Sequence, residues 1–427
     1  MSQEPVSSQI SQGTASAAAA GSPPSLPDVN AETYPFEYVQ YLLDQTADFN
    51  LFAVPDPQHA ATATLTPTDP SDYFGLNGGY GVSLRCSLHQ FDSMVQSPDI
   101  GLQVNEAVGE PRGSFSSLCF FGPDDSNWSP GQLPPPAIFD PWRSQRLTML
   151  NPEFSFGGGD RFQGFGIGRT FPVTVNGKPD LLVSAVGNVT DGFGKFSGLE
   201  GTFILTGKLR PDLGFLGNIT CRIVDPYGYI HGDREVSPPT TIRDPDPAST
   251  FLLLRGQKQD KSVRTTYGPP PGGGMVSLIT PSQLRAVQCS FSSRGGVHTE
   301  RRVGRVVGNM DADVHFDLLA PPGTARAPVP FTTQEDYRFV DCNEQIVGTI
   351  NAGVVEGISF KLEFPAAPGQ AGVRFAGFGP INGGTGAFDG IQGMLTVNSL
   401  IGIAPHALSL LHVLHILDPE GRFQRAS

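Results

Sequence analysis

The stretch GFGKFSGLEG at residues 192–201 decides the fold, because its pattern returns as GTGAFDGIQG at residues 384–393. Both stretches read G-x-G-x-F-x-G-x-x-G, so five positions agree in register. A pattern that recurs over such a long distance indicates an internal repeat of the size of a domain. We therefore expect the chain to contain two related units.

The likeness extends downstream of both glycine-rich stretches. TFILTGKL (202–209) matches MLTVNSLI (394–401), and ITCRIVDPYG (219–228) matches HVLHILDPEG (412–421) after a one-residue shift. Each copy reads as strand, glycine-rich turn, strand, turn and strand, which is an antiparallel meander. Its alternation predicts a half-buried sheet with apolar side chains on one face and polar side chains on the other: Phe203, Leu205 and Leu209 against Thr202, Thr206 and Lys208.

The glycine-rich turn also predicts how a barrel is closed. Glycine is needed there for positive φ angles and for the close approach of neighbouring backbones. We expect the aromatic residues of the pattern, Phe196 and Phe388, to fold inward and close one end of each barrel.

The composition favours short strands and turns. The 427 residues include 52 Gly and 39 Pro, and only 16% are charged, a balance typical of an all-β chain. This length exceeds what one hydrophobic core usually serves. We expect two tandem antiparallel β-barrels, divided near Asp246 in a Pro- and Asp-rich segment, behind a tail too polar to fold: disordered tail 1–33, first barrel domain 34–246 and second barrel domain 247–427.

Charge and hydropathy disfavour several classes of partner. The net charge is −13 and no long Lys/Arg run occurs, which argues against nucleic acid, because that affinity depends on cationic side chains. The first residues lack the cationic and apolar regions of a secretory signal, so we expect a cytoplasmic location. Pro405 and three histidines interrupt the apolar stretch 398–417, so no membrane span is expected. Self-association into a homo-oligomer stays open.

The cysteines favour neither a disulfide framework nor a zinc knuckle. They are odd in number and widely spaced, and no two form a CxxC pair,. We interpret all five as buried free thiols: Cys86, Cys119, Cys221, Cys289 and Cys342.

The string GGTGAFDGIQG, set between two strands, resembles the turn found in the allene oxide cyclase and dirigent barrels. The resemblance covers residues 182–228 and 374–421, and it implies an antiparallel barrel with an apolar lumen in each copy. It also implies chemistry without a cofactor, in which a barrel holds a reactive intermediate while it couples or closes a ring. Because the shared motif is a turn, it identifies no catalytic residue.

Two histidines in LSLLHVLHIL are the first catalytic candidates. His412 and His415 lie three residues apart, so on a strand they point to opposite faces and one of them faces an apolar interior,. A single lumen histidine can shuttle a proton near neutral pH. The alternative is a structural histidine of the core or of an interface. The first copy has Ile219 and Arg222 at the matching positions, which suggests that only the second barrel is active.

Three further residues are candidate catalytic groups. The strand DADVHFD (311–317) places three carboxylates and His315 on one face. Residues two apart on a strand are separated by almost 7 Å, so a solvated outer face is favoured over a metal site. In EDYRF (335–339) and SFKLE (359–363), charges near Tyr337 and Glu363 could polarise a substrate in a lumen,. The alternative for both segments is outward ion pairs.

Aromatic residues in long loops are candidates for substrate binding. Trp142 and Arg143 follow a Pro-rich loop, and Tyr73 and Tyr80 lie in a Gly-rich one. They either line a pocket at a barrel mouth or pack under the loops.

Signatures of cofactor and metal chemistry do not occur in the sequence. There is no Walker A motif, no G-x-S-x-G elbow and no H-E-x-x-H,. The glycine-rich turns have Ser197 and Asp389 where a dinucleotide motif needs its third glycine,. We therefore expect neither a cofactor nor a metal.

Three hypotheses for function follow. The first is a cofactor-independent cyclase or isomerase of specialised metabolism, whose apolar barrel folds a polyene- or polyketide-like substrate into a reactive conformer. The second is a non-catalytic barrel protein that binds an apolar small molecule or a partner protein. The third is a structural module whose barrels are filled with side chains. Ionisable groups shielded from water inside a barrel would favour the enzyme.

Overall fold

The computed structural model describes fifteen stretches of the chain, and all of them are built from β-strands and turns. A 3₁₀ turn at Gly194–Phe196 (η3) is the exception. The expected tail 1–33 and the expected boundary at Asp246 lie outside the described residues, which are 46–56, 66–67, 80–96, 103–122, 145–209, 214–225, 235–236, 248–258, 264–266, 275–292, 298–317, 329–341, 343–363, 371–402 and 408–423.

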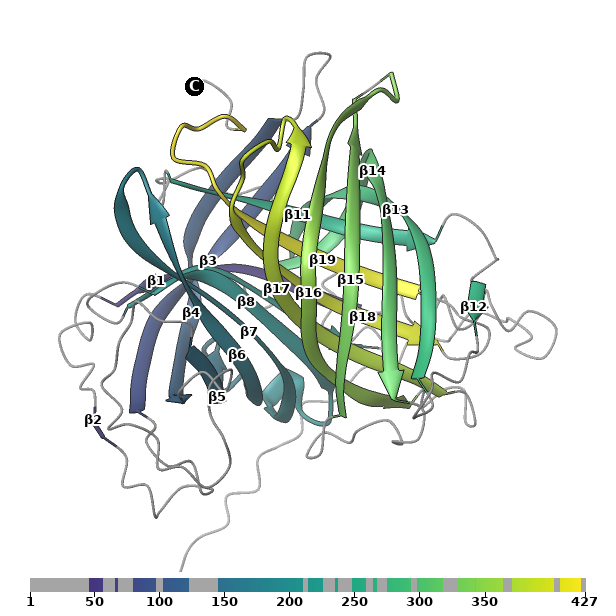
Figure 1. Ribbon diagram of the computed structural model, residues 1–427. Helices are drawn as coiled ribbons and strands as arrows, with labels where there is room; N and C mark the ends of the chain where they lie inside the picture. The colour runs from purple at the N-terminus through teal and green to yellow at the C-terminus, as the bar shows by residue number, and fades with distance from the viewer. Residues whose placement is uncertain are drawn as a thin grey trace, which may run out of the picture.

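The first sheet forms a closed antiparallel barrel of eight strands, coloured purple to teal in Figure 1. Its order is β1-β9-β8-β7-β6-β5-β4-β3, with the short β2 on the outside of β3. The barrel closes because β1 pairs with both β9 and β3. The strands are β1 (Thr46–Pro55), β2 (Thr66–Pro67), β3 (Tyr80–Gln96), β4 (Gln103–Gly122), β5 (Gln145–Ser155), β6 (Arg161–Val175), β7 (Lys178–Phe193), β8 (Glu200–Leu209) and β9 (Phe215–Val224).

The second sheet, green to yellow in Figure 1, repeats this succession. Its main path is β13-β11-β19-β18-β17-β16-β15-β14, and β13 also pairs with β14, which links the two ends of the path. The prediction of an all-β fold with a barrel is confirmed. The strands are β10 (Glu235–Val236), β11 (Ser249–Lys258), β12 (Arg264–Thr266), β13 (Met275–Ser292), β14 (His298–Asp317), β15 (Val329–Val340), β16 (Ile346–Glu363), β17 (Ala371–Gly386), β18 (Gly393–Gly402) and β19 (Leu408–Leu417).

The glycine-rich turns lie at equivalent places in the two sheets. They join β7 to β8 and β17 to β18, and in both copies the second and third glycines have positive φ: 63° and 74° in the first, 60° and 68° in the second. Phe196 is 1% exposed and packs against Phe49, Phe156 and Phe162. Phe388 is fully buried against Phe339 and Phe423. The expectation that both rings fold inward is confirmed.

The first glycine of the pattern is required because the turn leaves no room for a side chain at this position. A Cβ on Gly192 would overlap the carbonyl oxygen of Phe196 in the turn. We expect Gly192→Ala to lower the free energy of unfolding by about 3 kcal/mol, because the turn must shift to admit the methyl group. Chemical denaturation measures this loss.

Gly198 in the same turn provides the matched control. Its φ is +74°, and nothing lies within 4 Å of the position that a Cβ would take there. Gly198→Ala should therefore cost only the backbone strain of about 1–2 kcal/mol. Equal losses for the two variants would contradict the requirement for space at Gly192.

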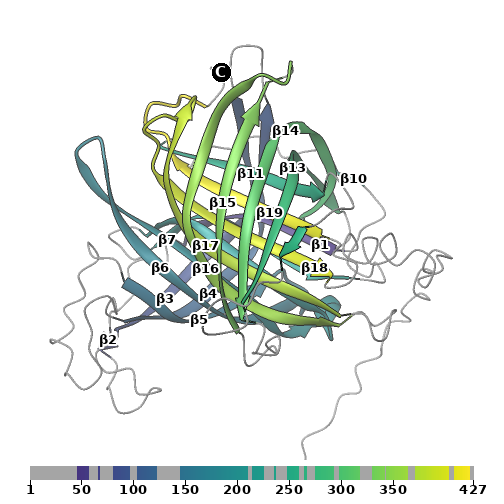
Figure 2. The ribbon, with the colours of Figure 1, turned by 45° about the vertical axis from the view of Figure 1, so that its right-hand side comes forward.

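Three apolar clusters make up the core. One fills the first barrel, the second lies inside the second sheet, and the third lies between the two sheets. The third cluster brings together side chains from strands far apart in the sequence, among them Phe52 and Leu182 from the first sheet and Phe251 and Met394 from the second. Figures 1 and 2 show this packing, in which β18 lies across β8 and β17 across β7.

This packing corrects one expectation from the sequence. The alternation of β8 predicts a half-buried strand, but every residue from Gly201 to Leu209 is buried. The polar face, with Thr202 and Thr206 at 0% exposure, meets the second sheet instead of water. The prediction of a solvated polar face is wrong because its hydroxyl groups find partners across the interface.

Candidate functional site

Three polar side chains meet inside the second sheet. Alternation along β15 turns Glu335 and Tyr337 inward, on the same face as Phe331 and Phe339. His412 reaches them from β19. All three are 1–2% exposed. We call Glu335, Tyr337 and His412 the inner cluster.

Hydrogen bonds fix the arrangement of the inner cluster. The Tyr337 hydroxyl donates to Oε2 of Glu335. His412 Nδ1 lies 2.9 Å from the Tyr337 hydroxyl oxygen and 3.4 Å from Glu335 Oε2. Because the phenol proton is used toward Glu335, the contact with His412 requires a proton on Nδ1. A neutral His412 then carries its lone pair on Nε2.

Two further properties suit this cluster to proton chemistry. Burial, together with the neighbouring Glu335, holds the pKa of Tyr337 well above its usual value, so the phenol remains a donor. His412 Nε2 is buried and has no hydrogen-bond partner within the described part of the chain. The cluster therefore presents an oriented base, held by a carboxylate through its other nitrogen, to the barrel interior.

The first barrel has apolar residues at the corresponding places. The two sheets can be compared position by position if Gly192 is aligned with Gly384 and the strand pairings are followed outward. Phe154 then takes the position that Tyr337 has in the second sheet. Ile219 takes the position that His412 has there. The inner cluster thus has no counterpart at these positions of the first barrel, and the expectation that only the second barrel is active stays a prediction.

The thiols inside the first barrel are buried, as expected for Cys86, Cys119 and Cys221. Burial raises the pKa of Cys86 and of Cys119 to about 12 and the pKa of Cys221 well above its usual value. Such thiols are protonated and unreactive near neutral pH. The side chain of Cys289 and residue Cys342 lie outside the described part of the structure.

The structure brings together two of the candidates from the sequence, Tyr337 and His412, and adds Glu335. For Glu335 the alternative of an outward ion pair is wrong, since its carboxylate is inside the sheet. The sequence indicated this burial, because Glu335, Tyr337 and Phe339 lie at every second position of the strand and therefore on one face. A carboxylate on the same strand face as Phe331, Tyr337 and Phe339 is expected to be buried together with them.

His415 lies on the opposite face of β19, as predicted, and packs between the sheets. Its ring stacks on Phe251 with centroids 4.4 Å apart. Nε2 contacts the hydroxyl of Ser249 at 2.9 Å, and Nδ1 contacts that of Thr206 at 3.4 Å. His415 therefore joins the two sheets and does not face the interior of the second one.

The remaining candidates are not brought to this site by the described atoms. His315 on β14 pairs with Ser277 and Thr332, and Glu363 ends β16 opposite Ala371. Tyr80 begins β3. Only the backbone of these three is described, and the other three candidates lie outside the described residues: Tyr73, Trp142 and Arg143.

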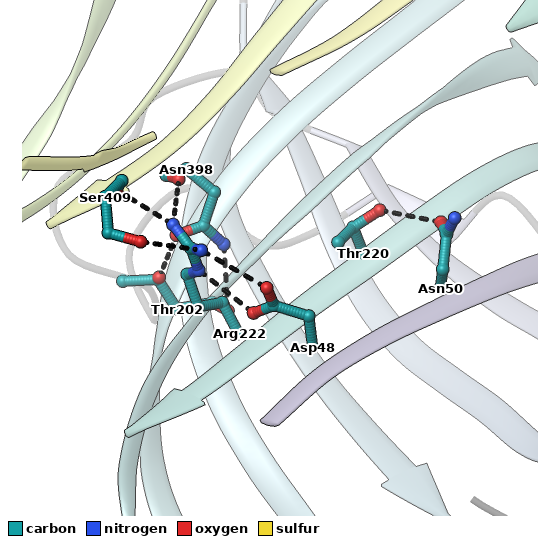
Figure 3. A network of polar contacts seen from close by, with 7 residues as sticks. All are labelled: Asp48, Asn50, Thr202, Thr220, Arg222, Asn398 and Ser409. Carbon is teal, nitrogen blue, oxygen red and sulfur yellow. Dashed lines mark hydrogen bonds and ion pairs between the residues drawn. The ribbon is translucent and has the colours of Figure 1, made fainter. Parts of the chain in front are cut away.

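A buried polar network crosses the interface between the sheets (Figure 3). The Arg222 guanidinium pairs with both carboxylate oxygens of Asp48, at 2.9 and 3.2 Å. It also donates to the Asn398 carbonyl at 3.1 Å and to the Ser409 carbonyl at 2.9 Å. The Thr202 hydroxyl donates to the Asn398 side chain. One cation thus joins β1 and β9 of the first sheet to β18 and β19 of the second.

The second copy uses different chemistry at the equivalent place. Register puts Asp48 opposite Arg222 in the first sheet and Phe251 opposite His415 in the second. An ion pair in the first sheet therefore corresponds to an aromatic stack in the second. Both pairs lie in the interface, where Arg222 contacts the second sheet and His415 contacts the first.

A second arginine, which belongs to the second sheet, contacts the first sheet across the interface. Arg374 on β17 donates to the Asn188 side chain at 2.6 Å and to the Gly201 carbonyl at 2.9 Å. It pairs with the half-exposed Glu200 at 3.1 Å. Burial lowers the pKa of Arg374 from its usual value, and Glu200 opposes this effect. These contacts hold β17 against β7 and β8.

Two open grooves lie at the edge of this interface. They have volumes of about 270 and 460 Å³ and share Val175, Asn176 and Pro419. The β6–β7 hairpin forms one wall, and the turn after β19 forms the other. No member of the inner cluster lines either groove.

Fold and site together define an all-β protein with a closed eight-stranded antiparallel barrel, a second sheet of like topology and a buried Glu–Tyr–His cluster within the latter. Comparison with known protein families, with curated proteins and with solved structures found no match.

Metal binding and membrane crossing are two further possibilities for a chain of this kind. Across the described ranges, no three His, Cys, Asp or Glu side chains lie close enough to hold a metal ion. In that same part of the chain, no helix has the length and apolar character needed to cross a membrane.

Proposed function

We propose that the second sheet forms the catalytic barrel of a cofactor-independent cyclase or isomerase, which acts on an apolar polyene- or polyketide-like substrate. The observation that carries the proposal is the inner cluster, a buried base oriented by a carboxylate and a phenol within an apolar interior. Burying polar groups in an apolar interior costs free energy unless they are hydrogen-bonded, and buried ionisable groups that perturb one another are enriched at functional sites. The first barrel, which has Phe154 and Ile219 instead, has no such groups at these positions.

The likeness to the allene oxide cyclase and dirigent barrels supports the same proposal. The matching order of eight strands in both sheets supports a duplicated barrel as the origin of the chain. In this interpretation the second copy carries the chemistry and the first copy stabilises it.

The chemistry follows from the position of the proton on His412. Nε2 takes a proton from a carbon next to a carbonyl group, and the electron pair moves into the carbonyl to give an enolate. The same nitrogen returns the proton at another carbon of the conjugated system, so protons and electrons balance without a co-reactant. Glu335 and Tyr337 hold the Nδ1 proton and stabilise the imidazolium that forms. Exclusion of water protects the intermediate.

Deuterium exchange into β-ionone, an apolar conjugated ketone, tests this proposal. We expect the protein in D₂O to accelerate exchange at the methyl carbon next to the carbonyl, whose protons are the enolisable ones. His412→Gln should slow the protein-dependent rate by at least about 100-fold, since general-base catalysis contributes about 10²–10⁴. NMR or mass spectrometry measures the incorporation.

A matched variant separates this effect from loss of folding. His89 lies in the first sheet, where it contacts the Ser87 hydroxyl and the Gly109 carbonyl. His89→Gln should exchange at the wild-type rate. A wild-type rate equal to that of buffer, or equal rates for wild type and His412→Gln, would reject the catalytic assignment.

The second candidate function is carriage of an apolar small molecule without chemistry. The apolar side chains that surround the inner cluster favour it. Native mass spectrometry before and after denaturation, with organic extraction, distinguishes the two. A released compound that the protein leaves unexchanged in D₂O would support the carrier.

A further inference from the structure

We propose that the interior of the second sheet binds a neutral, largely apolar molecule that carries a hydroxyl group. This inference rests on the proposed function, since it names the chemistry of the ligand at the same site. Its basis is a set of three buried polar atoms that lack hydrogen-bond partners within the described residues: Thr333 Oγ1, Ser399 Oγ and His412 Nε2.

The three atoms belong to one interior. Thr333 lies on the inward face of β15, in line with Phe331 and Tyr337, and is 1% exposed. Ser399 lies on the inward face of β18 and is fully buried. Its neighbours on that face, Val397 and Ile401, belong to the apolar cluster inside the second sheet. The inner cluster therefore shares the interior of the second sheet with two further polar side chains.

Register and ring contacts place the three atoms around a common region. His412 pairs with Val397, so Ser399 is its diagonal neighbour, at about 7–8 Å between backbones. Ser399 also pairs with Phe375. The Phe375 ring lies 5.1 Å from that of Phe331, which is two residues from Thr333.

Unsatisfied groups of this kind specify a ligand. A buried polar atom without a partner costs about 1–3 kcal/mol, so three of them in one interior favour a molecule that satisfies them. His412 Nε2 accepts a hydrogen bond and needs an O–H group from the ligand. The hydroxyl groups of Thr333 and Ser399 can donate to the two lone pairs of the oxygen of that same O–H group.

The charge of the interior favours a neutral molecule. The buried carboxylate of Asp418 follows β19 at the end of this interior, where it accepts a hydrogen bond from the Thr250 hydroxyl. On the inward faces of the described strands, the ionisable side chains are Glu335, Tyr337 and His412. None of these is a permanent cation, and the Glu335 carboxylate is 2% exposed. A second carboxylate would be repelled in this apolar surrounding.

Three probes with one carbon skeleton test the inference: geraniol, geranyl methyl ether and geranate. Isothermal titration calorimetry should show geraniol binding the wild-type protein at least about tenfold more tightly than the ether, which lacks the O–H donor. Geraniol should also bind at least about tenfold more tightly than geranate. Ser399→Ala and Thr333→Val should each reduce the preference for geraniol over the ether to about threefold or less.

Thr332→Val is the matched control, because Thr332 is exposed on the other face of the same strand. It should keep the wild-type preference. Equal binding of all three probes, tightest binding of geranate, or binding of none of them would overturn the inference. So would an unchanged preference in both Ser399→Ala and Thr333→Val, with folding verified by thermal unfolding.

The outcome is separable from that of the proposed function. A preference for geraniol without accelerated exchange of β-ionone would retain the ligand site and reject catalysis. Accelerated exchange without the preference would retain catalysis and reject this ligand chemistry.

Discussion

Alanine in place of Asp48 is expected to lower the free energy of unfolding by about 3–5 kcal/mol, because it leaves a buried guanidinium without its counter-charge. The side chains of Arg222 and Asp48 are 0% and 4% exposed, and the pair is bidentate. Both lie in the interface between the sheets, so the loss affects both copies. Urea denaturation at neutral pH measures it.

A double variant decides whether the charge or the packing is responsible. Replacing both partners by apolar residues of similar size, Asp48→Leu with Arg222→Met, removes the charge as well as its counter-charge. The double variant should recover at least about 1 kcal/mol relative to Asp48→Ala. A double variant less stable than the single one would show that the contacts of Arg222 with Asn398 and Ser409 matter more than its charge.

Phe203→Ala is expected to cost about 3–5 kcal/mol of stability, because the first barrel is filled with side chains. Phe203 is fully buried and its ring lies 5.7 Å from that of Phe154. The ring also occupies the space in front of Gly164 and Gly187, where a Cβ would collide with it. Thermal or chemical unfolding measures the cost.

Phe193 at the end of β7 provides the comparison. It is 39% exposed and lies beneath the Arg161 guanidinium, 4.6 Å from ring centroid to cation. Phe193→Ala should cost less than about 1 kcal/mol. A loss below about 1 kcal/mol for Phe203→Ala would instead indicate that the first barrel has an open lumen.

The repeat and its turn could be predicted from the sequence because they depend on local geometry. Gly194 and Gly386 adopt φ angles that other residues avoid, and the phenylalanine two positions later in each copy folds back over the core. Such requirements depend on residues that are close together in the sequence, so a sequence pattern can reveal them. The strand order around each sheet then follows from pairing successive strands.

The environment of the polar faces could not be predicted in the same way. Thr202 and Thr206 alternate with apolar residues as they would on a solvated strand, and alternation reports only that two faces differ. Whether the polar face meets water or another polar face depends on the second sheet. The partners are Asn398 and His415, almost two hundred positions further along the chain.

The candidate site was predictable in part. The spacing of His412 and His415 indicated that one of them faces the interior, and the mismatch with Ile219 indicated that this histidine has no counterpart in the first barrel. The meeting of His412 with Tyr337 depends on two strands on different sides of the second sheet, β19 and β15. Sequence patterns describe faces of single strands and carry no information on such a meeting.

The double burial of β8 and β18 has a consequence for how this protein can evolve. On β6, every second residue is at least partly exposed, so substitutions there cost less stability than substitutions of fully buried residues,. On β8 and β18, nearly every side chain touches either a barrel interior or the opposite sheet. These strands have almost no exposed positions, so a substitution on one of them is tolerated only together with a change in the side chain that it contacts. The ion pair between Asp48 and Arg222 and the aromatic stack between Phe251 and His415 are two matched pairs of this kind in the same interface.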